Sequence, residues 1–409
     1  MTAPDLLGIA QAALAGAWTR AALAARLAEV PLHTAPNPDP EALAARLLDL
    51  SPSPFFGPPE ALARLLAELP RQAEPPVPPR PRWRAEVPRW ETPADLAAAL
   101  RLTPGELDWF ADARTWNRRA ATPLRHYRHH WLGRRPLEVP KPRLAEIQRR
   151  LTRLLLSRLP VHEAAHGFRP GRSAATFAAP HAGQLLVARF DLAGFFTSIT
   201  AARLRAYFRH LGYPGNLAVA LTGLLTTATP PEVLRAAPAG PERHRLAVPH
   251  LPQGAPSSPA IANALAARLD RRLAGLAGRI GATYTRYADD LAFSGDLPVD
   301  RLRAGVRRIA LDEGFRLHPG KTRIAAAHQR QRLAGLVVNV RPAVSRTDYE
   351  RLRAVLHNCA RTAPAAQNHA GHPDFRAHLL GRIGWVGATH PARAARLRAI
   401  FDTIHWGQA

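Results

Sequence analysis

The chain is rich in apolar residues that recur every three or four positions, the spacing of an amphipathic helix. The clearest example is the stretch 141–159, where Leu144, Ile147 and Leu151 fall on one face. The same spacing predicts further helices over these stretches: 201–226, 260–276, 299–313, several segments within residues 1–70, and the chain from Arg346 onward.

Other stretches have the pattern of β-strands. The apolar run at 185–190 predicts a buried strand, and 335–339 predicts a shorter one. Aromatic and apolar residues alternate with polar ones on both sides of two aspartates over 284–294, which predicts a strand–turn–strand. Helices and strands together indicate an α+β fold.

Proline content marks the domain organisation. Residues 1–70 predict a small helical domain without a catalytic group, and the proline-rich stretch after it predicts a stiff linker. The chain is therefore expected to have four parts: an N-terminal helical domain at 1–70, a linker at 71–100, a central region at 101–340 and a basic helical region at 341–409.

The charge of the chain indicates its partner. With 56 basic and 31 acidic residues the formal net charge is +25, which predicts nucleic acid as a partner in preference to an acidic membrane. There is no apolar run of about eighteen residues and no cationic N-terminal start, so neither a membrane span nor a signal peptide is expected. The single cysteine, Cys359, excludes an intrachain disulfide and fits a reducing cytoplasm.

Arginines, histidines and aromatic residues gather between positions 109 and 135. This combination is expected where phosphates are neutralised and bases stack. The histidines His126, His129 and His130 could instead form a metal site, but no acidic or cysteine partner accompanies them. We interpret them as RNA-facing or core residues.

Lysine is rare in this chain. Of the 56 basic residues, only Lys141 and Lys321 are lysines. Because lysine can release a proton and arginine effectively cannot, a lysine kept in such a sequence is a candidate for a chemical role. Chance retention is the alternative, and for Lys141 the sequence does not choose between the two.

Three aspartates are the strongest candidates for chemistry. Asp289 and Asp290 lie at the predicted turn of the 284–294 hairpin, where an isolated pair would ordinarily be a solvated turn. Asp191 follows directly on the strand at 185–190, and a carboxylate at the end of a buried strand is costly unless it is paired or binds a metal. Together they predict a site for two Mg²⁺ ions, which prefer hard oxygen ligands.

Four motifs, in order along the chain, resemble those of reverse transcriptases. They are Phe190-Asp191-Leu192-Ala193-Gly194-Phe195-Phe196, Leu251-Pro252-Gln253-Gly254-Ala255-Pro256-Ser257-Ser258-Pro259, Tyr287-Ala288-Asp289-Asp290 and Gly320-Lys321-Thr322-Arg323. Within that family the chain is most similar to the bacterial retron enzymes, through Pro140–Gln148, Ala165–Phe168 and the tail Asp348–Trp406.

Three elements depart from the retron pattern. Phe177-Ala178-Ala179-Pro180-His181 keeps the alanine and histidine of the Asn-Ala-x-x-His element but lacks its asparagine. Leu333-Ala334-Gly335 stands where the family has Val-Thr-Gly, and the fingers hairpin is shortened to Gly133-Arg134-Arg135-Pro136. These departures concern the retron subtype and the way in which the RNA is held.

The resemblance implies a right-hand polymerase fold. Fingers and a palm, an antiparallel sheet flanked by helices, would occupy residues 101–340, and a basic helical thumb residues 341–409. In the palm, Asp191, Asp289 and Asp290 would hold two Mg²⁺ ions, and Lys321 would lie near the leaving pyrophosphate as a proton donor.

The resemblance also implies a nucleotide pocket. Phe196 would be the sugar gate that selects dNTPs over rNTPs, with core packing as the alternative role, which we assign to Phe195 instead. Gln253 and Gly254 would line the pocket, and Arg134 and Arg135 would contact the triphosphate.

As a retron enzyme, the chain would be an RNA-directed DNA polymerase in the bacterial cytoplasm. Its structured cognate RNA would be both template and primer, and a 2′-hydroxyl of that RNA would start the synthesis of RNA-linked single-stranded DNA through an RNA–DNA hybrid. The implied role is antiphage defence with a separate effector protein. The alternatives are another bacterial reverse transcriptase (group II intron, diversity-generating or abortive-infection type) and a non-catalytic RNA-binding protein.

Overall fold

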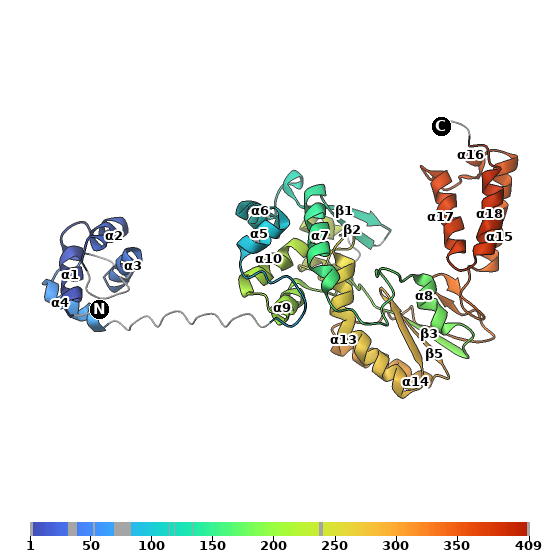
Figure 1. Cartoon of the computed structure of the whole chain (residues 1–409), viewed down its shortest axis with the longest axis horizontal. Helices are drawn as coiled ribbons and strands as arrows, with labels where there is room; N and C mark the ends of the chain where they lie inside the picture. The colour runs from blue at the N-terminus through green and yellow to red at the C-terminus, as the bar shows by residue number, and fades with distance from the viewer. Residues whose placement is uncertain are drawn as a thin grey trace. The chain divides into compact units, whose positions relative to one another are not determined.

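The computed structural model describes residues 3–31, 39–51, 54–68, 83–113, 115–117, 119–133, 135–236 and 240–406 (Figure 1). The chain divides into two compact units, Met1–Arg80 and Pro81–Ala409. Among the described residues, no helix combines the length and the apolar character that crossing a membrane requires.

The described residues of the first unit form four short helices, α1 (Ala3–Leu14), α2 (Arg20–Ala28), α3 (Pro40–Leu50) and α4 (Pro59–Glu68). They enclose a small core in which Ile9, Leu23, Leu47 and Leu62 are fully buried. Side-chain caps start two of the helices, since Thr19 accepts a hydrogen bond from the backbone at the start of α2 and Asp39 does so for α3.

Several helices of the second unit pack around one large core. They are α5 (Pro93–Leu100), α6 (Pro104–Ala111), α7 (Pro142–Leu154), α9 (Ala201–Leu211) and α10 (Gly215–Leu225). Thr92 and Thr103 each form a capping box ahead of a proline, which defines the starts of α5 and α6.

Two expectations differ from this part of the structure. The linker expected at 71–100 extends too far, because Val87, Leu96 and Leu100 are buried in the core of the second unit; residues 69–82 lie outside the described part. The helix expected over 201–226 is two helices, since Pro214 lacks the N–H that a continuous helix needs and stands instead at the N-cap of α10.

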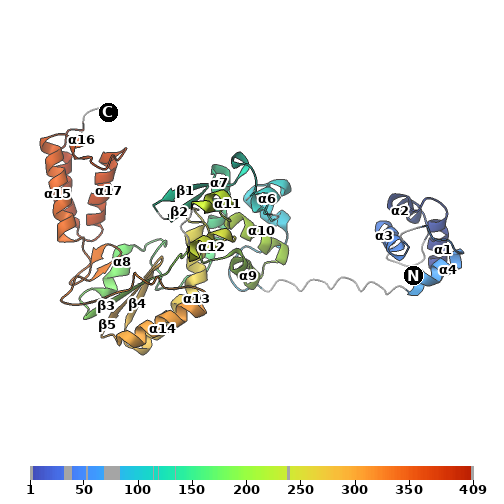
Figure 2. The same cartoon turned by 180° about the vertical axis from the view of Figure 1, so that it is seen from behind.

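A four-stranded antiparallel sheet forms the centre of the second unit. Its strand order is β4-β5-β3-β6, with β3 (Leu186–Asp191), β4 (Thr283–Tyr287), β5 (Asp290–Gly295) and β6 (Arg323–Ala326). Phe190, Leu291 and Phe293 belong to the same core as the apolar residues of α13 (Ser258–Arg279) and α14 (Val299–Asp312). The other face packs Val187 and Ala292 against α8 (Ala174–Ala178), so α8 and α14 lie on opposite sides of the sheet (Figure 2).

Smaller elements complete the unit. Besides β4–β5, the described residues form two further hairpins, β1 (Tyr127–Leu132) with β2 (Arg135–Pro140) and β7 (Arg332–Leu333) with β8 (Leu336–Val337). Strand β8 is shorter than the strand expected at 335–339. The C-terminal helices α15 (Arg346–Arg361), α17 (Phe375–Gly387) and α18 (Pro391–Asp402) share a core of their own. The remaining short helices are α11 (Pro231–Arg235), α12 (Pro241–Ala247) and α16 (Pro364–Gln367), with 3-10 turns at Thr122–Leu124, Leu156–Arg158 and Ala179–His181.

His181 joins the last of these turns to the sheet. Its ring is fully buried, with Nδ1 at 2.7 Å from Ser294 Oγ on β5 and Nε2 at 2.8 Å from Thr285 Oγ1 on β4. Burial is the main reason why the pKa of His181 falls to about 4.

This shift predicts an acid-sensitive contribution to stability. The unfolded chain, in which the pKa of histidine is about 6.5, binds the proton first, so stability that is present above that pH is lost as the pH falls toward 4. For this one group the loss is about 3 kcal/mol between pH 7 and pH 4. The measurement is the free energy of unfolding of the second unit in urea at pH 7 and at pH 4.5. On acidification this free energy should fall by about 2 kcal/mol less in His181→Gln than in the wild type. Equal losses would contradict this account.

Candidate active site

The two adjacent aspartates lie at the tight turn between β4 and β5. Tyr287 and Asp290 are partners in the ladder, which leaves Ala288 and Asp289 as the turn. Ala288 has φ +55°, a left-handed conformation that costs a residue with a Cβ on the order of 1 kcal/mol. The surrounding structure must therefore hold this turn in place.

The third aspartate comes from the neighbouring strand. Asp191, the last residue of β3, is the direct partner of Asp290 on β5, and directly opposed residues of an antiparallel pair project from the same face. The Leu192 N–H donates to the Asp289 carbonyl at 2.9 Å, so the main chain also joins the strand end to the turn. The structure thus brings the three predicted aspartates to one edge of the sheet.

Basic side chains bind two of these carboxylates. Lys321 Nζ lies 2.9 Å and 3.1 Å from the two oxygens of Asp191, and Arg189 Nε donates to Asp290 Oδ1 at 2.8 Å. As the side chains stand, no group of three or more His, Cys, Asp or Glu in the described part of the chain is arranged to hold a metal ion. Asp191 and Asp290 each contact a cationic side chain instead.

The chemistry of the site nevertheless suits a hard cation. Asp191 is 3% exposed, and its carboxylate already holds an ammonium group. Burial raises the pKa of the Asp290 carboxyl, while the Arg189 guanidinium opposes that shift. Carboxylate oxygens concentrated at one sheet edge are the donor type that Mg²⁺ prefers.

A buried ion pair holds the turn from behind. Arg286 on β4 and Asp270 on α13 are both fully buried, and Arg286 Nε and Nη2 each donate to Asp270 at 2.7 Å. Arg286 Nη1 also donates to the Ala288 carbonyl at 3.1 Å and to Asn263 Oδ1 at 3.0 Å. One guanidinium therefore connects the helix to the strained residue of the turn.

The turn also packs closely against Gly167. Asn263 Nδ2 donates to the Gly167 carbonyl at 2.8 Å, and a Cβ on Gly167 would lie 2.6 Å from the Ala288 nitrogen. A residue larger than glycine would therefore displace the turn. The sequence interpretation missed Arg286, Asp270 and Asn263, although a charged residue inside an apolar strand or helix is a signal that could have pointed to a buried pair.

The predicted aromatic residues occupy different environments. Phe195 is buried and stacks on Phe315 with ring centroids 5.7 Å apart, which confirms its expected packing role. Phe196 is half-buried and lies 6.1 Å, centroid to centroid, from Phe168, whose ring is 6.5 Å from Tyr287. Phe196 thus belongs to an aromatic group beside the aspartate turn.

The other predicted pocket residues contact the β1–β2 hairpin. The Gln253 carbonyl accepts the Glu138 N–H at 2.8 Å. Gly254 has φ +127°, and a Cβ there would lie 3.1 Å from the Glu138 carbonyl oxygen. Arg134 lies outside the described residues; Arg135 begins β2, and its side chain also lies outside them.

Lys141 has a structural explanation. Its Nζ donates to the carbonyls of Thr122 and Pro123 at 3.1 Å and 2.7 Å, and so ties the turn before β1 to the start of α7. The nearby His126 has a similar role, since its Nε2 lies 2.8 Å from the Trp109 carbonyl oxygen. These contacts hold the segment before the hairpin in place.

Comparison with known proteins identifies the family. Residues 133–349 match the family model described as reverse transcriptase (RNA-dependent DNA polymerase). The chain is 43% identical over 323 residues to the retron Mx65 reverse transcriptase of Myxococcus xanthus, which covers 76% of this chain and 71% of that one. The chain belongs to the retron reverse transcriptases.

Further relatives agree with this assignment. The retron Mx162 reverse transcriptase of Myxococcus xanthus is 38% identical over 322 residues, 73% of this chain and 64% of its own. The retron Ec86 reverse transcriptase of Escherichia coli is 31% identical over 227 residues, 55% of this chain and 65% of its own. This retron reverse transcriptase is therefore an RNA-directed DNA polymerase, of a family that generally uses divalent metal ions and has a right-hand polymerase fold.

The buried pair behind the turn leads to a stability prediction for this retron reverse transcriptase. Asp270→Asn removes the carboxylate that pairs with the buried Arg286 guanidinium, and the free energy of unfolding of the second unit should fall by about 3–5 kcal/mol. Urea unfolding measures this loss.

The matched control is Asp312→Asn. It makes the same chemical change at the pair between Arg272 and Asp312, whose side chains are 34% and 45% exposed. Exposed pairs contribute up to about 1 kcal/mol, so the control should remain near the wild type. Similar losses in both variants would show that the buried pair has no special importance.

Proposed function

We propose that this retron reverse transcriptase copies a structured cognate RNA, which is both template and primer, into RNA-linked single-stranded DNA. The observation that carries the proposal is the placement of Asp191 opposite Asp290 on paired strands, beside the turn that contains Asp289. DNA synthesis is phosphoryl transfer, in which the protein supplies positioning and neutralises charge.

In this proposal Asp191, Asp289 and Asp290 are the ligands of two Mg²⁺ ions. When bound, these ions would activate the primer hydroxyl and neutralise the triphosphate. The cationic partners support the assignment, since Lys321 contacts the carboxylate of Asp191 and Arg189 contacts that of Asp290.

Lys321 is the proposed proton donor to the leaving pyrophosphate. Its side chain is 41% exposed while its Nζ contacts the buried carboxylate of Asp191. Lys321 is therefore accessible from solvent and bound to the candidate site at the same time. An ammonium group can both attract the phosphates and give up a proton, whereas a guanidinium can do only the first.

The remaining assignments concern the nucleotide. Phe196 is the proposed sugar gate, and Gln253 and Gly254 line the pocket, held against β2 by the contacts described above. Arg134 and Arg135 are the proposed triphosphate contacts.

The subdomains follow the same proposal, with fingers and palm at 101–340 and a thumb at 341–409. The thumb would hold the RNA and the RNA–DNA hybrid through phosphates. A groove on α15 and α18 supports this role, since four arginines line it beside Tyr349: Arg346, Arg353, Arg393 and Arg396. Positive charge of this kind binds the nucleic-acid backbone and makes affinity fall with salt.

The biological role that we propose is antiphage defence in the bacterial cytoplasm, with a separate effector protein. Synthesis would start from a 2′-hydroxyl of the cognate RNA. The test is to express the protein with its native flanking DNA in a bacterium and to extract short single-stranded DNA. Its mobility should shift after debranching or RNase treatment. If the protein extends an added primer–template but no such product is found, the assignment as a polymerase stands and the proposed RNA-linked product is wrong.

The aspartate assignment makes the next prediction. Asp289→Asn combined with Asp290→Asn should abolish DNA synthesis, because the carboxylates that bind metal are gone, while the affinity for the cognate RNA stays nearly unchanged. Synthesis is followed by nucleotide incorporation, and affinity by filter binding to RNA transcribed from the flanking DNA.

The matched control changes two exposed aspartates that follow β5 in the sequence, Asp296→Asn with Asp300→Asn. It alters the net charge equally and should leave synthesis intact. Full polymerase activity in the Asp289/Asp290 variant would contradict the assignment of the aspartates as metal ligands.

The gate assignment predicts a change in sugar selection. Phe196→Ala or Phe196→Val makes room beneath the sugar, and the preference for dNTPs over rNTPs should fall by roughly 10- to 100-fold in kcat/KM. Phe168→Ala, which removes the neighbouring and 48% exposed ring, should change the preference less. An unchanged preference in the Phe196 variants would place the gate at another residue.

A further inference from the structure

Glu138 is a buried carboxylate that the proposed mechanism does not use. It lies in the middle of β2, and its side chain is 0% exposed. Removing a carboxylate from water costs several kcal/mol unless charge and hydrogen bonds compensate. The partners of Glu138 therefore indicate what this residue holds together.

Two fully buried side chains bind the carboxylate. Thr229 Oγ1 donates to Oε1 at 2.7 Å, and His250 Nε2 donates to Oε2 at 2.8 Å. The other ring nitrogen of His250 lies 2.7 Å from the Val248 carbonyl oxygen. Both ring nitrogens face acceptors, an arrangement that the doubly protonated imidazolium form satisfies with both of its N–H groups. Glu138 and His250 form a buried ion pair.

His250 belongs to a loop that continues through Gln253 and Gly254. The main chain of Glu138 contacts this loop at a second point. The Glu138 N–H donates to the Gln253 carbonyl at 2.8 Å. A Cβ on Gly254 would lie 3.1 Å from the Glu138 carbonyl oxygen. Glu138 thus holds the loop at His250 through its side chain and at Gln253 through its backbone. Two attachment points this close together fix the position of the loop relative to β2.

The loop is also attached to the segment that contains Phe196. The Leu251 N–H donates to the Ile199 carbonyl at 2.9 Å, and the Ile199 N–H donates to the Phe196 carbonyl at 3.0 Å. A shift of the loop at His250 would therefore reach both Gln253 and the backbone at Phe196.

We propose that Glu138 and His250 are a positioning pair, which sets the Gln253–Gly254 loop against the β1–β2 hairpin and so tunes the binding of the incoming nucleotide. The proposal rests on the nucleotide-binding role given to Gln253 and Gly254 above. Neither member of the pair is assigned a contact with substrate, so the pair acts through the loop.

The charges around the pair favour the ionised form. On β1, His129 is the partner of Glu138 in the ladder, but its Nε2 is 3.8 Å from Glu138 Oε1, too far for a hydrogen bond. That nitrogen has no hydrogen-bond partner among the described residues. Burial lowers the pKa of His129, so a neutral ring stands beside the carboxylate. His250 therefore provides the positive charge.

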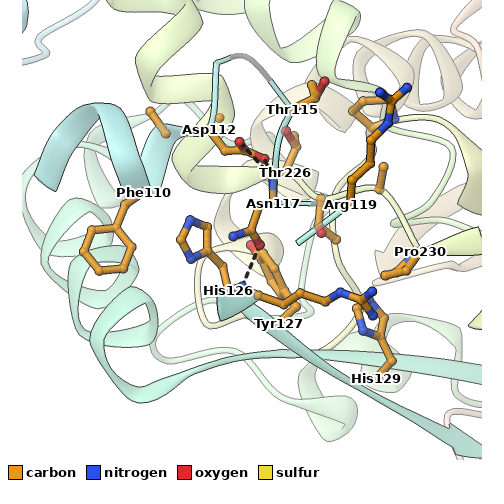
Figure 3. A pocket seen from close by; sticks show the side chains of 16 residues that line it. Phe110, Asp112, Thr115, Asn117, Arg119, His126, Tyr127, His129, Thr226 and Pro230 are labelled. Carbon is orange, nitrogen blue, oxygen red and sulfur yellow. Dashed lines mark hydrogen bonds between the residues drawn. The ribbon is translucent and has the colours of Figure 1, made fainter. Parts of the chain in front are cut away.

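Further charged groups lie on the neighbouring elements. Arg125, before β1, pairs with Glu232 on α11, and Glu242 on α12 adds negative charge near His250. His129 and Arg125 also line a cavity of about 280 Å³ (Figure 3). Burial is the largest single influence and opposes the charge on His250, but the Glu138 carboxylate, the Val248 carbonyl and Glu242 together outweigh it, so the pKa of His250 is raised.

The test compares the steady-state kinetics of dTTP incorporation on a poly(rA)–oligo(dT) primer–template by the full chain. Glu138→Gln and His250→Gln each remove one charge, and each should raise the KM for dTTP roughly tenfold while kcat stays within about twofold, since a charge-assisted hydrogen bond is lost. The double variant should be no worse than either single variant, because the two residues act as one unit. Thr229→Val removes one hydrogen bond and no charge, and should raise KM roughly two- to threefold.

A pH profile separates positioning from a general structural role. The raised pKa means that the pair is complete at lower pH and is lost as the pH rises through the pKa of folded His250. The wild-type KM should therefore rise on the alkaline side, and the double variant should lack that rise. Glu232→Gln, which removes a neighbouring carboxylate outside the pair, should keep the wild-type profile.

Two outcomes would overturn the inference: a wild-type KM in both single variants, or a fall in kcat with KM unchanged. Gln253→Ala distinguishes this failure from a failure of the proposed nucleotide pocket. If Gln253→Ala raises KM and Glu138→Gln does not, only the positioning pair is wrong. If Gln253→Ala leaves KM at the wild-type value, the loop is not part of the nucleotide pocket.

Discussion

The ion pair between Arg286 and Asp270 is the interaction on which the candidate site depends. Both side chains are fully buried, so the pair is favourable only because the hydrogen bonds of the guanidinium are satisfied. Those bonds reach Asp270, Asn263 and the Ala288 carbonyl. The left-handed turn at Ala288 is thereby tied to α13. Without this connection, nothing in the local sequence would favour a strained alanine beside two aspartates.

Charge is distributed in opposite ways on the surface and at the site. The chain as a whole carries a net charge of +25, which attracts nucleic acid from any direction. At the sheet edge, three carboxylates reverse the sign locally, and Lys321 and Arg189 balance two of them. The proposed mechanism uses both features, because polyanionic substrates are attracted over a distance whereas metal ions need carboxylate oxygens.

Much of the sheet and the candidate aspartates could be predicted from the sequence, because each was a local pattern. Asp191 ends an apolar run and Asp289 stands at the crest of an alternating hairpin, and neither inference needs a partner from elsewhere. Arg286–Asp270 and Glu138–His250 could not be paired in this way, since their partners come from separate segments and no local rule says which charges meet. The position of each charged residue among apolar neighbours was visible, but its partner was not.

The errors in the element assignments have local causes. Apolar spacing continues through the break between α9 and α10, so the helical pattern concealed the interruption at Pro214. The expected linker extended too far because proline content outweighed the capping threonines Thr92 and Thr103, which mark the starts of helices. Where composition and capping residues disagreed, the capping residues were correct, since they report on specific hydrogen bonds.

The buried charges of this fold share a physical logic. An apolar pair of similar volume could stabilise the interior equally well, but it would tolerate small shifts that an ion pair does not. A slip of one residue in β4 would turn Arg286 to the opposite face of the sheet, away from Asp270, and a slip in β2 would do the same to Glu138. Each pair therefore penalises a wrong register at a strand that borders the site. These costly pairs secure the register of the strands that border the candidate site more than they add to the total stability.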